Sequence, residues 1–277
     1  QQVSVIIPVG LARSGNTVVA GGVEFDPIGL GVDTVAASIP GIVAFPGAPD
    51  SVAVTVSAPA INMFTPAQGT GRLGNGLQDQ GSGSLQVVNP GPGALTVHLV
   101  SSNSSVVMLA PDAVTPGQPT LDIQVPLNQS SLSYFIQGVG TGTATITASA
   151  TGYTNGISPT VTVATPGFDI LGLTTSTTSS AANDAFLVRL GVPNTTLTAL
   201  SAEQSVRAGS TPVTATISNS NQTAAQLVTT ATTGQLVSVT IPVGQARSPA
   251  SVVLGGVEFD PLASGITTVS ANIPTYV

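Results

Sequence analysis

The sequence contains no cysteine, no lysine and no tryptophan among its 277 residues. Without cysteine, disulfide bonds cannot stabilise the fold, and thiolate catalysis and cysteine-based zinc sites are excluded. Without lysine, a Lys–Asn isopeptide cross-link is excluded as well. Stability therefore has to come from core packing and from the hydrogen bonds between strands.

Positive charge is scarce, and the formal net charge is -7. Nucleic-acid binding and electrostatic binding to anionic lipid both need clustered Lys and Arg side chains. The sequence therefore excludes nucleic acid as a partner and argues against an electrostatic membrane surface. All five basic residues are isolated arginines: Arg13, Arg72, Arg189, Arg207 and Arg247.

Long apolar segments are missing too. No run of about 18 apolar residues is present, so no segment is expected to span a membrane as a helix. The first residues lack the charged n-region and apolar h-region of a signal peptide, so a leader is expected to have been removed or to lie far upstream. Because 42% of residues are hydrophobic and only 6% are charged, the chain is expected to fold rather than to be disordered.

Ser, Thr, Val, Gly and Ala dominate the composition. β-branched residues favour strands, and the 31 glycines and 21 prolines favour turns. Period-2 alternation of apolar residues indicates strands with one buried face. We therefore predict an all-β fold. The alternating positions are Val3/Val5, Val52/Val54/Val56, Leu95/Val97/Leu99, Thr143 to Ala150, Val161/Val163 and Val213/Ala215/Ile217. For the segment Asn183 to Leu190 we favour a strand over a short helical turn.

The strongest feature is an internal repeat. Residues 1–43 match residues 235–277 without a gap, at an offset of 234 and with 27 identities in the 43 positions. A weaker copy lies between them, because residues 95–109 resemble residues 213–227 at an offset of 118. The long period is therefore expected to contain two units of about 117 residues, and an immunoglobulin-type sandwich takes about 100 residues. The first match includes GGVEFDP at 21–27 and 255–261, and the weaker copy also relates Val125-Pro126 to Ile241-Pro242 and residues 142–153 to residues 265–276.

The middle of the chain resembles the bacterial Ig-like (BIG-type) repeats of large surface proteins. The resemblance is carried by SSNSSVVML (101–109), VTPGQPTLDIQVPL (114–127) and SYFIQGVGTGTATITASATGY (133–153). It extends to the rest of the chain through the internal repeat. The resemblance implies tandem immunoglobulin-like β-sandwich domains in an extended array and a bacterial, exported protein. It does not imply a particular function, since such domains serve as stalks, adhesins and spacers.

The repeat also predicts domain boundaries. Residues 1–58 are expected to be the C-terminal half of an Ig-like domain, residues 59–165 a complete domain, and residues 166–277 a domain without its last strand. Two explanations are open for the incomplete domains. Either the residues are one period, plus an overlap, of a longer covalent array, or separate subunits complete one another by donating strands. We favour the array because it accounts for the 43 residues that occur twice.

Candidate chemistry is sparse. His98 is the only histidine and falls on the polar face of its strand, so a solvated side chain is expected rather than a catalytic base, and no GxSxG motif is present. The pairs Glu24/Asp26 and Glu258/Asp260, with Asp33 near the first pair, offer few ligands for calcium. Their carboxylates are expected to point outward while the Val and Phe residues between them point inward. We assign no catalytic, cofactor-binding or metal-binding residue and expect no cofactor.

Arg13 and Arg247 recur a few residues before the two acidic pairs. This arrangement predicts a structural ion pair between the arginine and the acidic pair that follows it, which would pin the intervening loop. An exposed pair of this kind contributes only about 0–1 kcal/mol.

The sequence therefore predicts a structural protein and no enzyme. The chain is expected to contribute to an extended extracellular or cell-surface fibre or filament, and to associate with neighbouring repeats or with copies of itself. The alternative is an adhesin stalk, in which one unit binds a glycan or a surface protein through its loops. The non-repeated segments Phe64 to Gly83 and Phe168 to Leu200 are the expected places for such a site.

Overall fold

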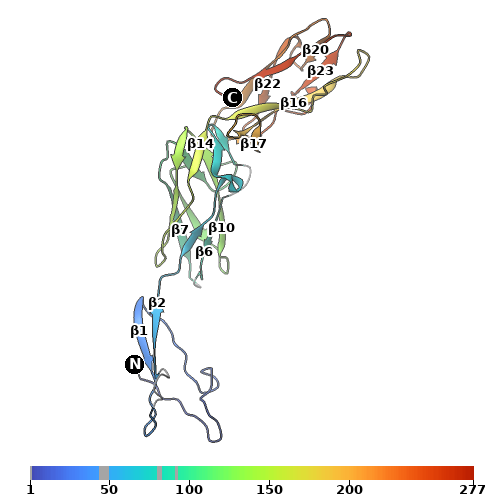
Figure 1. The fold of residues 1–277 in the computed structure, drawn as a ribbon. Helices are drawn as coiled ribbons and strands as arrows, with labels where there is room; N and C mark the ends of the chain where they lie inside the picture. The colour runs from blue at the N-terminus through green and yellow to red at the C-terminus, as the bar shows by residue number, and fades with distance from the viewer. Residues whose placement is uncertain (1, 44–49, 80–82, 91–92) are drawn as a thin grey trace. The chain divides into compact units, whose positions relative to one another are not determined.

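The computed structural model describes residues 2–43, 50–79, 83–90 and 93–277. The chain divides into two compact units, residues 1–58 and residues 59–277 (Figure 1). Nearly all regular structure is β-strand, and the predicted all-β class with several sheets is confirmed. No helix in the described parts of the chain is long and apolar enough to cross a membrane.

The N-terminal unit contains one hairpin. Strand β1 (Gly31–Ala36) pairs antiparallel with β2 (Ser51–Val56), from Gly31 opposite Val56 to Ala36 opposite Ser51. The predicted strand at Val3 and Val5 is wrong, because this segment has no regular structure. An alternating pattern forms a strand only where a neighbour accepts its backbone hydrogen bonds, and no strand among the described residues pairs with it.

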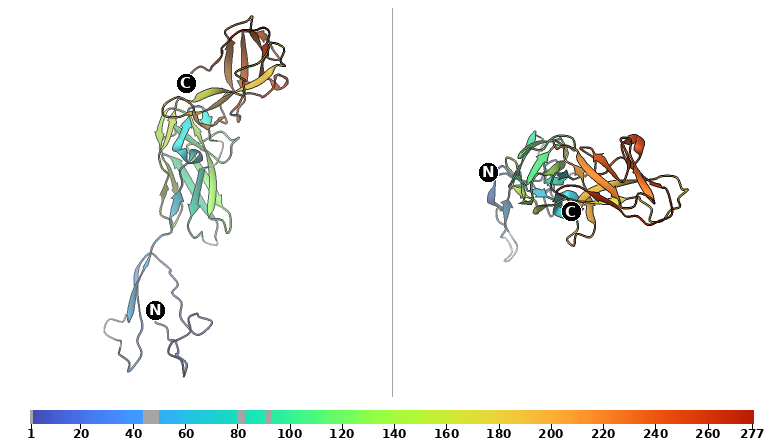
Figure 2. Two further views of the ribbon diagram at one scale, coloured as in Figure 1. Left: turned by 45° about the vertical axis from the view of Figure 1, so that its right-hand side comes forward. Right: turned by 90° about the horizontal axis from the view of Figure 1, so that it is seen from above.

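The second unit begins with a β-sandwich that we call the central sandwich. Its two layers are visible in Figure 2. One layer contains β3, β6, β10, β5 and β8, and the other contains β13, β12, β7 and β9 together with β11, β14 and β4. The elements are β3 (Ile61–Met63), the π-helix η1 (Ala67–Gly71), β4 (Arg72–Gly74), β5 (Leu77–Gln78), β6 (Gly83–Val87), β7 (Leu95–Ser101), β8 (Val107–Ala110), β9 (Thr120–Val125), β10 (Ser131–Gly138), β11 (Gly142–Ala144), β12 (Ile146–Ser149), β13 (Gly156–Ile157) and β14 (Val161–Ala164).

The core of the central sandwich follows the alternation read from the sequence. Val97 and Leu99 of β7 and Val161 of β14 have no exposed surface, while the residues between them face outward. These side chains belong to one hydrophobic cluster with Tyr134 and Ile136 of β10. The predicted strands at 95–99, 143–150 and 161–163 are confirmed.

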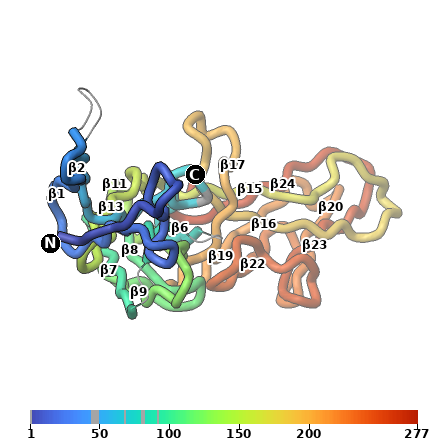
Figure 3. The backbone as a smooth tube through the Cα atoms, turned by 90° about the horizontal axis from the view of Figure 1, so that it is seen from below, coloured from blue at the N-terminus to red at the C-terminus, as the bar shows by residue number. Residues whose placement is uncertain are grey.

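The remaining residues form the C-terminal sandwich, whose trace in Figure 3 shows β16 running beside β15 and β23. One sheet has the order β15-β16-β23-β20-β21, with β17 paired to β16, and the other has the order β22-β19-β24. The strand prediction for Asn183 to Leu190 is confirmed by β16. The elements are β15 (Gly167–Leu171), β16 (Asp184–Pro193), β17 (Leu200–Glu203), β18 (Ser205–Val206), β19 (Val213–Asn219), β20 (Ala225–Val228), β21 (Thr233–Gly234), β22 (Leu236–Ile241), the 3-10 helix η2 (Val252–Leu254), β23 (Val257–Pro261) and β24 (Val269–Asn272).

Tyr134 leads to a test of the central core. Its ring is fully buried, and its hydroxyl has no hydrogen-bond partner among the residues that the structure describes. Burial raises the pKa of Tyr134 above its ordinary value of 10.0. Because a buried, unpaired hydroxyl costs about 1–3 kcal/mol, we expect Tyr134→Phe to leave the free energy of unfolding unchanged or to raise it by about 1 kcal/mol.

The same substitution should alter the response to alkali. Above pH 10.0 the unfolded chain loses the Tyr134 proton while the folded chain keeps it, so stability falls as the pH rises. Tyr134→Phe should remove the part of this stability loss that comes from the Tyr134 hydroxyl. Tyr153→Phe, at a less buried tyrosine, is the control. Urea titrations at neutral and alkaline pH measure both effects, and an equal alkaline loss in the variant would contradict the assignment.

Candidate functional site

The most extensively built polar site of the second unit lies where the two sandwiches meet. Strand β18 of the C-terminal sandwich pairs antiparallel with β5 of the central sandwich, with Ser205 opposite Gln78 and Val206 opposite Leu77. The backbone N–H of Arg207 then donates to the carbonyl of Gly76 at 3.1 Å. A sheet of the central sandwich is thus extended by a strand of the next sandwich.

Leu77 joins the hydrophobic cores across this junction. It lies on a strand of the central sandwich, yet its fully buried side chain belongs to the cluster of the C-terminal sandwich, which includes Phe186, Leu190 and Val206. Leu73, four residues earlier, is equally buried but belongs to the central cluster. One short segment therefore contributes an apolar side chain to each core.

Three buried glutamines hold the polar part of the junction. Gln78 accepts hydrogen bonds at Oε1 from the backbone N–H of Ala208 (2.8 Å) and from Nε2 of Gln137 (3.3 Å). Gln137 also accepts from the N–H of Gly117 (2.9 Å) and donates to the carbonyl of Thr115 (2.9 Å). Because an unpaired buried amide is costly, these contacts fix the positions of the loops that they join.

Gln204 forms the corresponding contact from the C-terminal sandwich. Its Oε1 accepts from the N–H of Gly74 at 2.8 Å, and its Nε2 donates to the carbonyl of Arg72 at 2.9 Å. The side chain is 1% exposed. An amide satisfies one donor and one acceptor of the central sandwich at once without burying a charge.

Glycine is required at position 138, beside the segment of the central sandwich that forms the junction. A Cβ atom at Gly138 would lie 2.5 Å from the carbonyl oxygen of Gly74, and neither backbone atom can move without disturbing β10 or β4. The carbonyl of Gly138 accepts the N–H of Gly76 at 2.9 Å. The part of the central sandwich that forms the junction is therefore itself packed to backbone contact.

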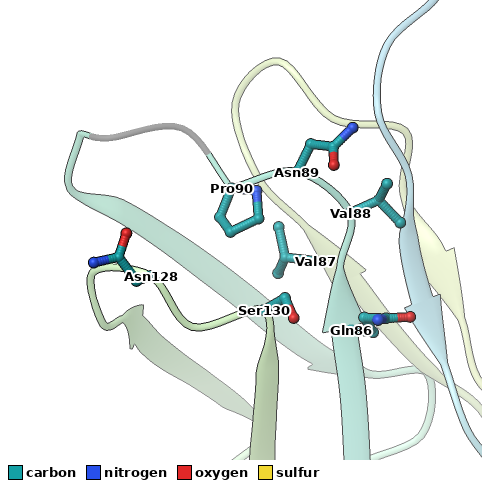
Figure 4. A pocket seen from close by; sticks show the side chains of 7 residues that line it. All are labelled: Gln86, Val87, Val88, Asn89, Pro90, Asn128 and Ser130. Atoms are coloured by element: carbon teal, nitrogen blue, oxygen red, sulfur yellow. The ribbon is translucent and has the colours of Figure 1, made fainter.

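The central sandwich carries an uncovered counterpart of the surface that docks here. At the repeat offset of 118, Gln204, Val206 and Ala208 correspond to Gln86, Val88 and Pro90. The first three are 0–2% exposed, whereas their counterparts are only partly buried. The counterparts help to line a hollow of about 420 Å³ together with Val87, Asn89, Asn128 and Ser130. Figure 4 shows Asn128 on a separate loop from Asn89 and Pro90, which lie along the other side of the hollow.

His98 lies on the outer face of β7, as predicted. Its Nδ1 is 2.5 Å from Oδ1 of Asp122, its direct neighbour on β9, and the two side chains are 47% and 65% exposed. Ser149 is the neighbour on the other side, but its hydroxyl donates to the backbone carbonyl of His98 at 3.5 Å and not to the ring. The row of Ser149, His98 and Asp122 therefore lacks the nucleophile-to-base hydrogen bond of a catalytic triad.

The acidic pair Glu258 and Asp260 of the C-terminal sandwich points outward as predicted. Val257 is fully buried, and Phe259 packs against the core. The predicted ion pair between Arg247 and these two carboxylates is wrong. Asp260 accepts from Nε2 of Gln226 at 2.7 Å, and Glu258 accepts from Nδ2 of Asn183 at 3.3 Å. Within the described ranges, no three His, Asp or Glu side chains are grouped closely enough to hold a metal ion.

Arg247 instead pairs with Glu203, through bonds of 2.8 Å from Nε and 2.7 Å from Nη2. The hydrogen bonds to Glu203 raise the pKa of Arg247. Beside them Arg189 donates two bonds to Asp169, so two bidentate pairs lie next to each other where Arg189 and Arg247 form a β-bridge. Sequence reasoning missed Glu203 because it lies 44 residues from Arg247, on a strand whose pairing the sequence does not specify.

This ion pair leads to a modest prediction. Since Arg247 is 48% exposed, Glu203→Gln should lower the free energy of unfolding by about 0.5–1 kcal/mol at low salt. The loss should shrink when salt screens the charges. Denaturant titrations at low and high ionic strength measure it. A loss that is independent of salt would show that packing rather than charge is responsible.

Comparisons with known proteins give structural neighbours only. No family model and no curated protein matches the sequence. Among solved structures, domains 4–9 of the surface layer protein SbsC match 90% of this chain at 14% identity and a TM-score of 0.28, and the chain spans about a third of that structure, 34%. Domains 5–6 of SbsC match 76% of this chain and 98% of theirs at the same identity and score. The C-terminal domain of the Streptococcus agalactiae AgI/II polypeptide BspA matches 78% of this chain and 96% of its own at 9% identity and a TM-score of 0.18.

Proposed function

We propose that the chain is a structural component of an extended extracellular or cell-surface filament built from tandem Ig-like repeats, and not an enzyme. In this proposal residues 59–165 and 166–277 are successive domains and residues 1–58 belong to the preceding one. The observation that carries the proposal is the junction, in which β18 extends a sheet of the preceding sandwich and the buried amides of Gln78 and Gln204 bond across it. Such a junction fixes one domain on the next.

The internal repeat supports the same role. The hollow beside Gln86, Val88 and Pro90 occupies the position that the junction residues occupy in the following domain. We propose that it receives the end of another sandwich, through contacts of the kind made by Gly74 to Gln78. Junctions repeated in this way would produce an array of any length.

Immunogold electron microscopy of the source cells, with an antibody against this chain, tests the proposed role. We expect label along fibres or a continuous layer outside the cell. Label restricted to the cell interior would overturn the proposal.

The adhesin alternative depends on one of the two non-repeated segments. Leu77 and Gln78, in the first of them, are buried in the junction and cannot contact a partner there. The second contains the loop between β15 and β16, where residues 174–180 are all exposed. Binding to a glycan array that is lost when this loop is shortened would favour an adhesin. Binding that survives removal of the loop would contradict an adhesin site in this segment.

A further inference from the structure

The N-terminal unit already has the local conformation of its C-terminal copy. In residues 17–22 the N–H groups of Ala20 and Gly22 both donate to Thr17, at 3.1 and 2.7 Å. In the copy, Leu254 and Gly256 donate to Ser251 at 3.0 and 2.8 Å. The intervening glycines have matching left-handed φ angles, 81° at Gly21 and 92° at Gly255. The loop is therefore encoded by its own sequence.

The two copies differ in what covers them. Val3, Val5, Ile7, Val23 and Ile39 are 59, 42, 41, 54 and 47% exposed. The identical residues at 237, 239, 241, 257 and 273 are 2, 2, 0, 0 and 3% exposed. The same side chains therefore form a sandwich core at residues 237–273 and an exposed apolar surface at residues 3–39, and an exposed apolar surface is a place where a partner can bind.

In the C-terminal copy, residues 166–234 cover these apolar side chains, and we call this covering part of the chain the seat. Phe186, Ile217 and Leu227 of the seat lie in one cluster with Val237 to Ile241 and Val257. Backbone pairing joins them, because β22 and β24 pair with β19 while β23 pairs with β16 and β20.

The seat also complements the polar residues of the copy. Glu203 binds Arg247, Gln226 binds Asp260 and Asn183 binds Glu258. Each of these three partners has an identical residue at the same offset in the N-terminal unit. Arg13, Asp26 and Glu24 are therefore chemically suited to the same seat.

We propose that residues 2–43 and β2 of one copy of the chain bind the seat of a second copy, in place of its residues 235–277. The exchange joins an N-terminal unit to a C-terminal sandwich, so the contact is head-to-tail, and its repetition from copy to copy would build the proposed filament. This inference deepens the filament role proposed above by stating how subunits join.

Strand β2 accompanies the donor segment because it pairs with β1, although it lies beyond the region that matches residues 235–277. In the central sandwich the comparable strand β14 pairs with β11, with Gly142 opposite Val163, as Gly31 lies opposite Val56. Both glycines have a φ of 143°. All other contacts are exchanged for equivalent ones.

The displaced segment has the advantage of belonging to the same chain, which raises its effective concentration at the seat. The exchange therefore requires the resident segment to leave the seat. A substitution that weakens only the resident segment should favour the exchange. Val239 is suitable because it is 2% exposed and its counterpart Val5 stays intact in the donor.

Cysteine cross-linking tests the exchange, because the chain has no cysteine of its own. Ala185 lies opposite Glu258, whose counterpart is Glu24. Two full-length variants, Ala185→Cys with a size tag and Glu24→Cys without one, are mixed at high concentration and oxidised. Cross-strand neighbours lie within disulfide range, so we expect a covalent heterodimer on a non-reducing denaturing gel.

The control replaces Glu24→Cys by Val32→Cys, which is exposed on β1 and lies outside this register. The heterodimer should be lost in this mixture. Adding Val239→Asp to the Ala185→Cys copy should increase the heterodimer by about tenfold or more, since a charge buried without a partner expels the resident segment. Adding Val5→Asp to the donor should abolish the increase.

Two results would overturn the inference: a heterodimer no more abundant than with Val32→Cys, or one that does not respond to Val239→Asp. Extracellular label in the immunogold experiment together with either result would reject the exchange and leave the filament role intact. Label inside the cell would reject that role whatever the cross-linking shows.

Discussion

Replacing Leu77 with alanine should lower the free energy of unfolding of the C-terminal sandwich by about 3 kcal/mol, although Leu77 lies on a strand of the central sandwich. The side chain has no exposed surface and packs in the cluster of Phe186, Leu190 and Val206. Its loss leaves a cavity at the point where β5 and β18 pair, so the junction and the C-terminal core are weakened together. Denaturant unfolding measures the loss, and amide hydrogen exchange in β19 and β22 locates it.

Leu73→Ala is the matched control, because Leu73 is equally buried but packs in the central cluster. It should accelerate exchange in β7 and β12 and leave β19 protected. Leu236→Ala, at a position 65% exposed, should have little effect on either sandwich. If Leu77→Ala and Leu73→Ala destabilised the same sandwich, the assignment of Leu77 to the following domain would be wrong.

Gln137→Ala should lower the free energy of unfolding by about 2–3 kcal/mol, because it leaves several buried groups without a partner. The N–H of Gly117 and the carbonyl of Thr115 would each lose the bond that Gln137 now supplies. Gln78 would lose one of its two acceptor contacts, so its bond to Ala208 across the junction should weaken. Thermal and denaturant unfolding give the total effect, and exchange of the Ala208 amide reports the junction.

Gln124→Ala serves as the comparison. Gln124 is exposed and donates only to the hydroxyl of Thr96, at 2.8 Å, so its removal should change stability by less than about 0.5 kcal/mol. Equal losses in the two variants would mean that burial of the Gln137 amide is unimportant. An unchanged Ala208 exchange rate in Gln137→Ala would separate this glutamine from the junction.

The sequence predicted most of the strands but not the junction. Alternation in Leu95/Val97/Leu99 and Val213/Ala215/Ile217 predicted buried strand faces because that pattern is a local property of the chain. The same pattern in Val3/Val5 failed because a strand also needs a partner. The partners of Gln78 and Gln204 lie 130 residues away, and Gln78, in its Gly-rich stretch, has the sequence context of a solvated loop residue.

One signal could have indicated the junction earlier. The offset of 118 aligns Gln86 with Gln204 and Val88 with Val206, so a polar and an apolar position recur together just before the strand that begins at Leu95 or Val213. The pairing of His98 with Asp122, and of Arg247 with Glu203, depends on strand register. Register follows from the way whole sheets pack, which no short motif encodes.

Because the junction uses amide side chains, its hydrogen bonds respond little to pH and to salt concentration. Glutamine side chains bear no titratable proton and no net charge, so neither acid nor concentrated salt alters the bonds made by Gln78, Gln137 and Gln204. The pair of Arg247 and Glu203 on the outer face is different, because acid protonates the carboxylate and salt screens the charges. The two sandwiches should therefore keep the same amide bonds at low and high ionic strength and at neutral and acidic pH, while the ion pair on the outer face responds to both.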